Sequence, residues 1–212
     1  MRRAALLLAL AGALAGCFQL HVPAPTMHDY RLDYAPPQVE GRPLAVVLQI
    51  APLAVAAMYD RDAIVYREGT YSTGTYPDSR WSTNPGSLVT DLLARDFGDS
   101  ELYRAVQLGP SLLAGDYHVG GEIEEIEEIE EEPNAGGCAA HLRLRMLVAR
   151  LRPGKDDPVL LQHAYTGEEP CPCNQPRALV AAMSQGLAKI SAQLQRDVYD
   201  AIAADTRQVT LP

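Results

Sequence analysis

The chain has 212 residues, of which 47% are hydrophobic and 21% charged, and its formal net charge is −9 at pH 7. This length is enough for one domain of ordinary size. Because a chain this acidic gains nothing from neutralising phosphate groups, its charge excludes nucleic acid as an expected partner.

The N-terminus has the features of an export signal followed by a lipid-attachment site. Two arginines come near the start of the chain, the stretch 4–14 is apolar, and small residues lead to Cys17. The apolar stretch is too short to cross a bilayer, which takes about 20 residues. Residues 14–17, with the sequence LAGC, resemble the lipobox of bacterial lipoproteins, in which the signal is cut before the cysteine and the cysteine is acylated. The alternative is an ordinary signal peptide with an incidental cysteine.

We therefore expect a lipoprotein signal peptide over residues 1–16 and a membrane anchor on Cys17, since two or three acyl chains bind a membrane durably. Without residues 1–16, which hold two of the 18 basic residues and none of the 27 acidic ones, the formal charge falls to −11. Phe18 follows the cysteine, where an aspartate would retain an enteric lipoprotein in the inner membrane. That resemblance implies the outer membrane, facing the periplasm. The proline-rich residues 17–42 are expected to form a flexible tether.

The next elements follow from short-range patterns. Residues 44–50 form an apolar, β-branched run and predict a buried strand. Two runs, 64–67 and 71–76, are separated by Glu-Gly-Thr and predict a hairpin. An asparagine cap and a proline at the first helical position predict a helix over 84–98. Residues 102–108 predict a further strand.

A glutamate-rich run follows, and residues 121–132 read GEIEEIEEIEEE. So many carboxylates must be solvated or neutralised. Isoleucine recurs at every third position, which fits a short helix, whereas the flanking glycines and Pro133 fit a strand end with a solvated extension equally well. A calcium loop would alternate acids with glycine and turn-forming oxygens, and this run does not. We expect residues 122–132 to form a solvated edge that discourages unwanted strand pairing.

The C-terminal half predicts a strand pair and a long helix. Residues 141–151 alternate between apolar side chains and arginines, as a half-buried strand does. After a turn at 153–156, residues 158–166 are expected to return as its partner. Residues 176–204 predict an amphipathic helix. Its apolar stripe consists of Leu179, Met183, Leu187, Ile190, Leu194, Val198 and Ile202.

Strands outnumber helices in this pattern and are mostly joined by short turns. The predicted fold class is therefore α+β, an antiparallel or mixed β-sheet with about two helices packed on one face. We expect a single domain over residues 43–205 and a C-terminal tail over 206–212.

Three cysteines remain after Cys17. If the two late strands pair about their turn, opposed residue numbers sum to 309, which sets Cys138 opposite Cys171. A change of one residue in the loop would bring Cys173 closer instead. Since facing strands lie within disulfide range and export implies an oxidising compartment, we expect a disulfide from Cys138 to one of these two. A redox or zinc site at Cys-Pro-Cys is weaker, because redox motifs favour two intervening residues and zinc needs four ligands.

The sequence offers little for catalysis. It has no Gly-x-Ser-x-Gly nucleophile motif, no phosphate-binding glycine loop and no zinc-protease helix motif. The histidines at 118, 141 and 163 stand apart from one another. We therefore expect no enzymatic activity, no cofactor and no metal.

One series of short motifs is more specific as a set than singly. An Ile-Val-Tyr-Arg motif at 64–67 is followed by Tyr76, then Arg-Trp at 80–81, then Pro85 and a leucine-bearing helix. Together with the lipobox, Tyr-Arg-Leu at 30–32, the late strand pair and the C-terminal helix, this order resembles the ABC-type transport auxiliary lipoproteins. That family includes the paraquat-inducible-type lipoprotein of mammalian-cell-entry (MCE) lipid transport systems.

The resemblance implies an outer-membrane-anchored accessory subunit that faces the periplasm and docks an MCE-type ABC transporter. The transporter would move lipid, expected to be phospholipid, between the inner and outer membranes. The implied partners are an MCE-domain protein and the ABC permease and ATPase subunits, and a homo-oligomer is a further expectation. Five residues are expected to form either a partner surface or the fold signature of the family: Tyr66, Arg67, Tyr76, Arg80 and Trp81.

Two other functions stay open. One is an envelope structural or assembly lipoprotein without a transport partner, and the other is a periplasmic module that binds a small ligand. The glutamate-rich run and the Cys-Pro-Cys segment depart from the family pattern, and we interpret the glutamate-rich run as an insertion.

Overall fold

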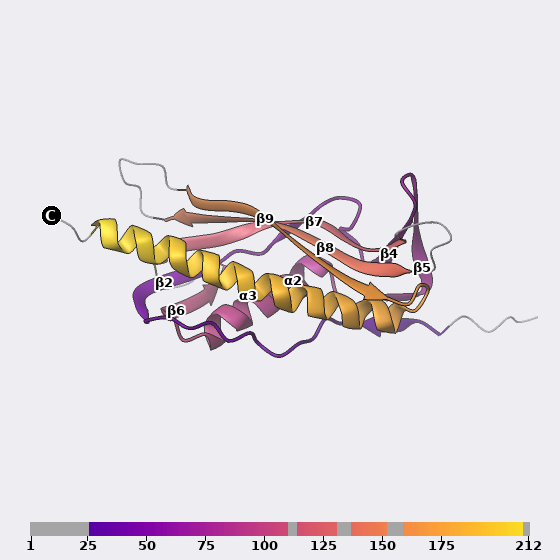
Figure 1. The fold of residues 1–212 in the computed structure, drawn as a ribbon, viewed down its shortest axis with the longest axis horizontal. Coiled ribbons are helices and arrows are strands. Elements are labelled where there is room, and N and C mark those ends of the chain that lie inside the picture. Colours follow the sequence, from indigo (N-terminus) through magenta and orange to yellow (C-terminus); the bar gives the residue numbers. More distant parts are fainter. Residues whose placement is uncertain (1–25, 110–113, 131–136, 152–158, 210–212) are drawn as a thin grey trace, which may run out of the picture.

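The computed structural model describes residues 26–109, 114–130, 137–151 and 159–209. They form one mixed sheet of nine strands and two helices (Figure 1). The strands are β1 (His28–Tyr30), β2 (Leu44–Ile50), β3 (Ala54–Val55), β4 (Ala63–Glu68), β5 (Ser72–Trp81), β6 (Tyr103–Leu108), β7 (Tyr117–Glu130), β8 (Cys138–Arg150) and β9 (Val159–Cys171). The helices are α2 (Pro85–Asp99) and α3 (Pro176–Val209). The predicted α+β class is confirmed, and the sheet is mixed.

Elements with strong local patterns occur where they were predicted. Helix α2 begins after Asn84, whose side-chain oxygen accepts a hydrogen bond from the Gly86 N–H at 2.9 Å. Helix α3 continues past residue 204 to Val209, and each of its seven stripe residues is at most 2% exposed. Within the described residues, neither helix is long and apolar enough to cross a bilayer. The expected signal peptide, Cys17 and the turn at 153–156 lie outside the described residues.

The glutamate-rich run forms most of β7, which lies in the middle of the sheet. Strand β7 pairs with β8 along its length on one edge, and with β2, β3 and β4 in turn on the other. The prediction of a solvated edge is therefore wrong, as is the alternative of a short helix. The charge of the run could not reveal this, because the basic side chains that neutralise it come from other strands, from β8 about 20 residues further along the chain and from β4 about 60 residues before it.

A β-bulge reconciles the three-residue spacing of Ile123 and Ile126 with a strand. The register of β7 shifts between Ile123 and Glu125, which leaves Glu124 as an extra residue. Residues three apart in a regular strand point to opposite faces, but the extra residue returns Ile126 to the face of Ile123. Both isoleucines are at most 1% exposed, packed on the face that the helices cover. We call this the inner face, and the alternation places Glu128 on it too.

The register predicted for the late hairpin is confirmed over most of its length. Leu144 lies opposite Tyr165 and Val148 opposite Leu161, both summing to 309. The register shifts by one residue only near the turn, beyond Val148. The expectation that Cys138 faces Cys171 across the ladder is thus correct.

Both helices cover the inner face, and α3 runs almost the full length of the molecule (Figure 1). The two helices are joined where Ser191 of α3 donates a hydrogen bond of 2.5 Å to Asp96 of α2. Helix α3 approaches β9 closely at Gly167 and Gly186. A Cβ on Gly167 would lie only 2.9 Å from the carbonyl oxygen of Gly186, so the crossing requires glycine on the strand.

The segment expected to be a flexible tether packs on the sheet and helices from His28 onward. Strand β1 pairs in parallel with the end of β5, and Leu32 is 4% exposed in the core. The Tyr34 hydroxyl donates a hydrogen bond to Asp96 at 2.6 Å. The tether boundary at residue 42 therefore lies too far along the chain. The prolines in this segment end regular structure without preventing an ordered extended path.

Candidate functional site

The family-motif residues of β4 and β5 fall into three different settings. Trp81, the last residue of β5, is 2% exposed in the core beside β1. Arg80 is exposed and pairs with Asp29 of β1 at 2.7 Å. These two residues join β5 to the N-terminal segment, one by packing and the other by charge.

Tyr66 and Tyr76 form an aromatic pair on the inner face, beside Glu128. Their ring centroids lie 5.3 Å apart in an edge-to-face arrangement. Tyr66 packs over Gly74, where a Cβ would meet the ring at 2.4 Å. The Tyr76 hydroxyl donates a hydrogen bond of 2.9 Å to Glu128 Oε1, and burial together with this bond raises the pKa of Tyr76. The tyrosines therefore cover an acidic side chain from β7.

Glu128 is 4% exposed, although it lies in a strand rich in glutamate. Its Oε1 accepts the bond from Tyr76 and a long one, 3.4 Å, from the Asn174 N–H. Its Oε2 has no hydrogen-bond partner among the described residues. Burial raises the pKa of this carboxyl, and the two hydrogen bonds only partly oppose the shift.

Arg67 lies on the opposite, outer face and pairs with Glu127. The Arg67 Nε is 2.8 Å from Glu127 Oε1, and the glutamate is 2% exposed whereas the arginine is 35% exposed. Tyr59, also buried, lies beside the same carboxylate, and burial and then the charge of Glu127 raise the pKa of Tyr59. A buried carboxylate thus depends on one arginine from β4.

The remaining outer face of β7 and β8 carries a network of ion pairs. Glu124, the extra residue of the bulge, accepts hydrogen bonds from Arg143 and Arg145. The hydrogen bond from Arg143 lowers the pKa of Glu124. His141 lies between Glu125 and Glu168, at 2.7 and 3.2 Å. Among the described residues, no three acidic, histidine or cysteine side chains are placed to hold a metal ion.

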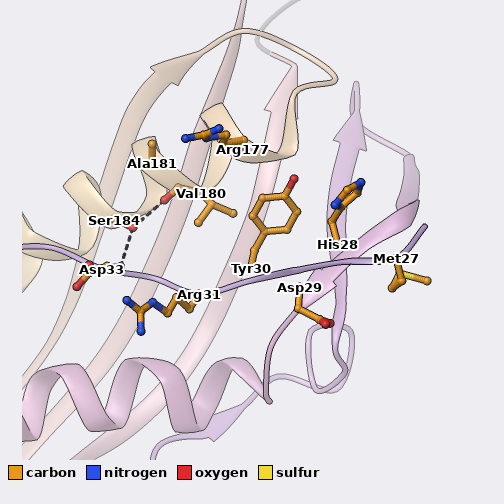
Figure 2. A pocket seen from close by; sticks show the side chains of 10 residues that line it. All are labelled: Met27, His28, Asp29, Tyr30, Arg31, Asp33, Arg177, Val180, Ala181 and Ser184. Carbon is orange, nitrogen blue, oxygen red and sulfur yellow. Dashed lines mark hydrogen bonds between the residues drawn. The ribbon is translucent and has the colours of Figure 1, made fainter. Parts of the chain in front are cut away.

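A groove of about 750 Å³ separates the N-terminal segment from the first turns of α3 (Figure 2). His28 and Tyr30 point to one side of the segment and Asp29 and Arg31 to the other. Ser184 of α3 closes the groove at one end, accepting a hydrogen bond from the backbone N–H of residue 33 at 3.1 Å and donating one to the backbone of α3. The lining mixes both signs of charge with apolar groups.

The cysteines lie at the same end of the molecule as the tyrosine pair. Cys138 forms a disulfide with Cys173, which decides between the two partners left open by the sequence. Cys171 is a buried free thiol, and burial raises its pKa to about 11. Sequence spacing could not choose between the two, because the choice depends on the path of the chain between β9 and α3.

The most exposed large apolar or aromatic side chain among the described residues is a different one. Tyr71 is 98% exposed in the turn that joins β4 to β5, two residues after Gly69, whose φ is +63°. Tyr71 begins the second run of the predicted hairpin, but only the structure separates it from Trp81, which is buried, and from Tyr66 and Tyr76, which are half-buried. The turn projects from the body of the sheet in Figure 1.

Comparison with known proteins identifies the family. Residues 30–195 match the family described as ABC-type transport auxiliary lipoprotein component. A search of curated proteins gave no match. A Xanthomonas campestris protein of the DUF330 family has a similar structure, with a TM-score of 0.68 and 21% identity over 86% of this chain and 97% of that chain.

Two further solved structures share the fold at lower identity. An uncharacterized protein has a TM-score of 0.62 and 14% identity over 82% of this chain and 99% of that one. A hypothetical protein from Chlamydia trachomatis has a TM-score of 0.50 and 13% identity over 73% and 98%. At such identities the likeness shows the fold alone, whereas the family match spans most of the sequence. The chain therefore belongs to the family of ABC-type transport auxiliary lipoprotein components.

Proposed function

We propose that this chain is the outer-membrane-anchored accessory lipoprotein of an MCE-type ABC transport system, and that it docks the transporter's periplasmic end. The transported cargo in this proposal is lipid, specifically phospholipid, passing between the inner and outer membranes. The observation that carries the proposal is the family match over residues 30–195, which follows a lipobox-like LAGC sequence. The chain's own part is docking, so it needs no catalytic group, cofactor or metal.

The packing of the N-terminal segment against the folded domain supports a docking role. If Cys17 carries the lipid, eight residues, 18–25, separate it from the first described residue of the chain, a reach of about 30 Å when fully extended. From His28 onward the segment is held by β5, α2 and α3. The membrane would therefore hold the folded domain within a short, fixed reach.

We assign the partner contact to the β4–β5 turn around Tyr71. An exposed tyrosine supplies a large contact area with a polar tip, as residues at protein interfaces do. Of the motif residues, Trp81 is buried in the core, Tyr76 is half-buried and packs against the core, and Tyr66 is half-buried against Tyr76 and Gly74. We therefore assign these three residues to the fold signature, in which their packing holds the β4–β5 hairpin on the sheet.

The test is photo-crosslinking in native membranes. A photoreactive phenylalanine analogue would replace Tyr71 in one strain and Leu151 in another. Leu151 is a matched control because it is 40% exposed and follows β8 at the other end of the ladder. We expect position 71 to capture an MCE-domain protein or its permease, and position 151 to capture neither.

Other captures would contradict the proposal in identifiable ways. Recovery of only outer-membrane or cell-wall assembly proteins would favour a structural lipoprotein. Crosslinks between copies of the chain at position 71 would assign that turn to a homo-oligomer instead. Loss of the chain from membranes after Cys17→Ser would test the anchor separately.

A further inference from the structure

Of the three cysteines in the folded domain, Cys138 lies near both of the others. Cys138 begins β8, Cys171 ends β9, and Cys173 lies two residues further on, before α3. The disulfide joins Cys138 to Cys173, with their Cα atoms 5.1 Å apart. Cys171, however, is the residue directly opposite Cys138 in the β8–β9 ladder.

Both partners of Cys138 therefore satisfy the distance that a disulfide needs. Residues directly opposite in an antiparallel ladder have Cα separations of about 4.5–5.5 Å, and disulfides form over about 4.4–6.8 Å. Facing residues also project to the same side of the sheet. Cys138 and Cys171 are 4% and 8% exposed, so both side chains lie in the same buried end of the core.

We propose that these cysteines form an exchangeable set, in which the Cys171 thiolate attacks Sγ of Cys138 and releases Cys173. One S–S bond forms as one breaks, and the leaving Cys173 thiolate takes up the proton that Cys171 lost. No external oxidant or reductant is consumed, because the number of disulfides and free thiols is unchanged. The protein thus has two disulfide isomers of the same oxidation state.

The two isomers differ in how the start of α3 is held. In the present isomer the disulfide ties residue 173 to the sheet, and the adjacent Asn174, at φ +57°, donates its N–H to Glu128. A bond from Cys138 to Cys171 would lie within the ladder and leave the connection 172–175 without a covalent tie. That connection leads directly to Arg177 and Val180, which line the groove of Figure 2. Exchange would therefore change the constraint on one wall of this groove.

The rate of exchange should depend strongly on pH. Thiolate is the attacking species, and burial raises the pKa of Cys171 to about 11. Below that pKa the thiolate fraction rises about tenfold for each unit of pH. The isomer with the Cys138–Cys173 disulfide should accordingly persist at neutral pH and exchange faster at mildly alkaline pH.

The test maps the free thiol in the full chain. Folded protein would be incubated between about pH 7 and 9, quenched with acid, alkylated in denaturant and digested for mass spectrometry. Among Cys138, Cys171 and Cys173, we expect label on Cys171 alone at the start, and label on Cys173 to appear about tenfold faster for each unit of pH. Cys173→Ser should form the Cys138–Cys171 disulfide, whereas Cys171→Ser should keep Cys138 bonded to Cys173 and leave neither of the two labelled.

Label confined to Cys171 at every pH would overturn the proposal, whatever the variants do. So would a folded Cys173→Ser protein in which Cys138 and Cys171 both stay reduced under air. Circular dichroism of each variant would establish that it is folded before its thiols are mapped. These outcomes do not depend on which partner the lipoprotein docks.

Discussion

Two neighbouring glutamates show how one strand places like charges in opposite environments. Glu127 and Glu128 are both almost fully buried, but alternation sends the first to the outer face and the second to the inner face. Glu127 meets Arg67, whereas Glu128 meets only neutral donors. The two side chains should therefore respond differently to mutation and to pH.

Removal of Arg67 should destabilise the fold by leaving Glu127 buried without its cation. Breaking a fully buried pair costs about 3–5 kcal/mol, and because Arg67 is 35% exposed we expect about 2 kcal/mol for Arg67→Met. Chemical denaturation at neutral pH measures the change. Arg80→Met is the control, since that pair is exposed on both sides and its loss should cost much less than that of the Arg67 pair. Adding Glu127→Gln should recover most of the loss, and equal effects of the two arginine variants would contradict this account.

Glu128 and Glu124 should give opposite pH dependences. Burial raises the pKa of Glu128 in the folded state, so the folded protein binds this proton more tightly and loses stability as the pH rises through that pKa. Glu128→Gln should therefore raise the melting temperature at pH 8, with little effect near pH 4, about the ordinary pKa of glutamate. The bond from Tyr76 can be kept by the glutamine oxygen.

The matched variant is Glu124→Gln. The hydrogen bond from Arg143 lowers the pKa of Glu124, so its stabilisation is present above the ordinary pKa and is lost as the pH falls through the lowered one. This variant should lower the melting temperature at pH 8, and the loss should shrink in acid. Melting curves of both variants and the wild type across this pH range would decide, and shifts of the same sign would refute the burial argument.

At the scale of elements, the crossing of α3 over β9 depends on a glycine that no pattern in the sequence marks. A Cβ on Gly167 would press against backbone atoms of Gly186 at 2.9–3.1 Å, which cannot move aside as a side chain would. A Cβ on Gly186 would meet its nearest atom at 3.6 Å, an ordinary contact. Two glycines that face each other are thus not equivalent.

We expect Gly167→Ala to destabilise the protein by about 1–3 kcal/mol through overpacking. Gly186→Ala should be neutral or stabilising by up to about 1 kcal/mol, since alanine favours the helix interior. Urea denaturation of the two variants provides the comparison. A loss at Gly186 as large as that at Gly167 would show that α3 lies closer to β9 than described.

At the scale of the whole molecule, the N-terminal segment is part of the folded domain. It supplies Leu32 to the core, pairs its first strand with β5 and hydrogen-bonds through Tyr34 to the carboxylate that also joins α2 to α3. If Cys17 carries the proposed lipid anchor, a segment so placed would transmit the position of that anchor to the body of the protein. This is the arrangement that the proposed docking role requires.

A chain that starts at residue 43 should therefore be much less stable than one that starts at residue 26. Loss of a buried leucine alone costs about 2–5 kcal/mol, and the lost hydrogen bonds add to it. The chain from residue 26 is the control and should melt like the full chain. Thermal unfolding of both chains measures the effect. Equal melting temperatures would show that the segment does not stabilise the domain and acts only as a tether.

The sequence by itself determined the features that depend on neighbours in the chain. Periodicity located α2 and α3, a turn set the register of β8 against β9, and counting strands established the α+β class. These succeed because a 3.6-residue or two-residue repeat reports directly which face of an element is buried. The family motifs, taken in order, likewise pointed to the family that residues 30–195 match.

Only the tertiary structure decided the features that depend on contacts between distant residues. The glutamate-rich run is a central strand because a bulge places Ile126 on the same face as Ile123 and because Arg67, Arg143 and Arg145 approach from other strands. Cys173 rather than Cys171 bonds to Cys138 because of the path taken into α3. Composition gives the charge of a segment but not its counterions, and burial of charge is a property of the assembled fold.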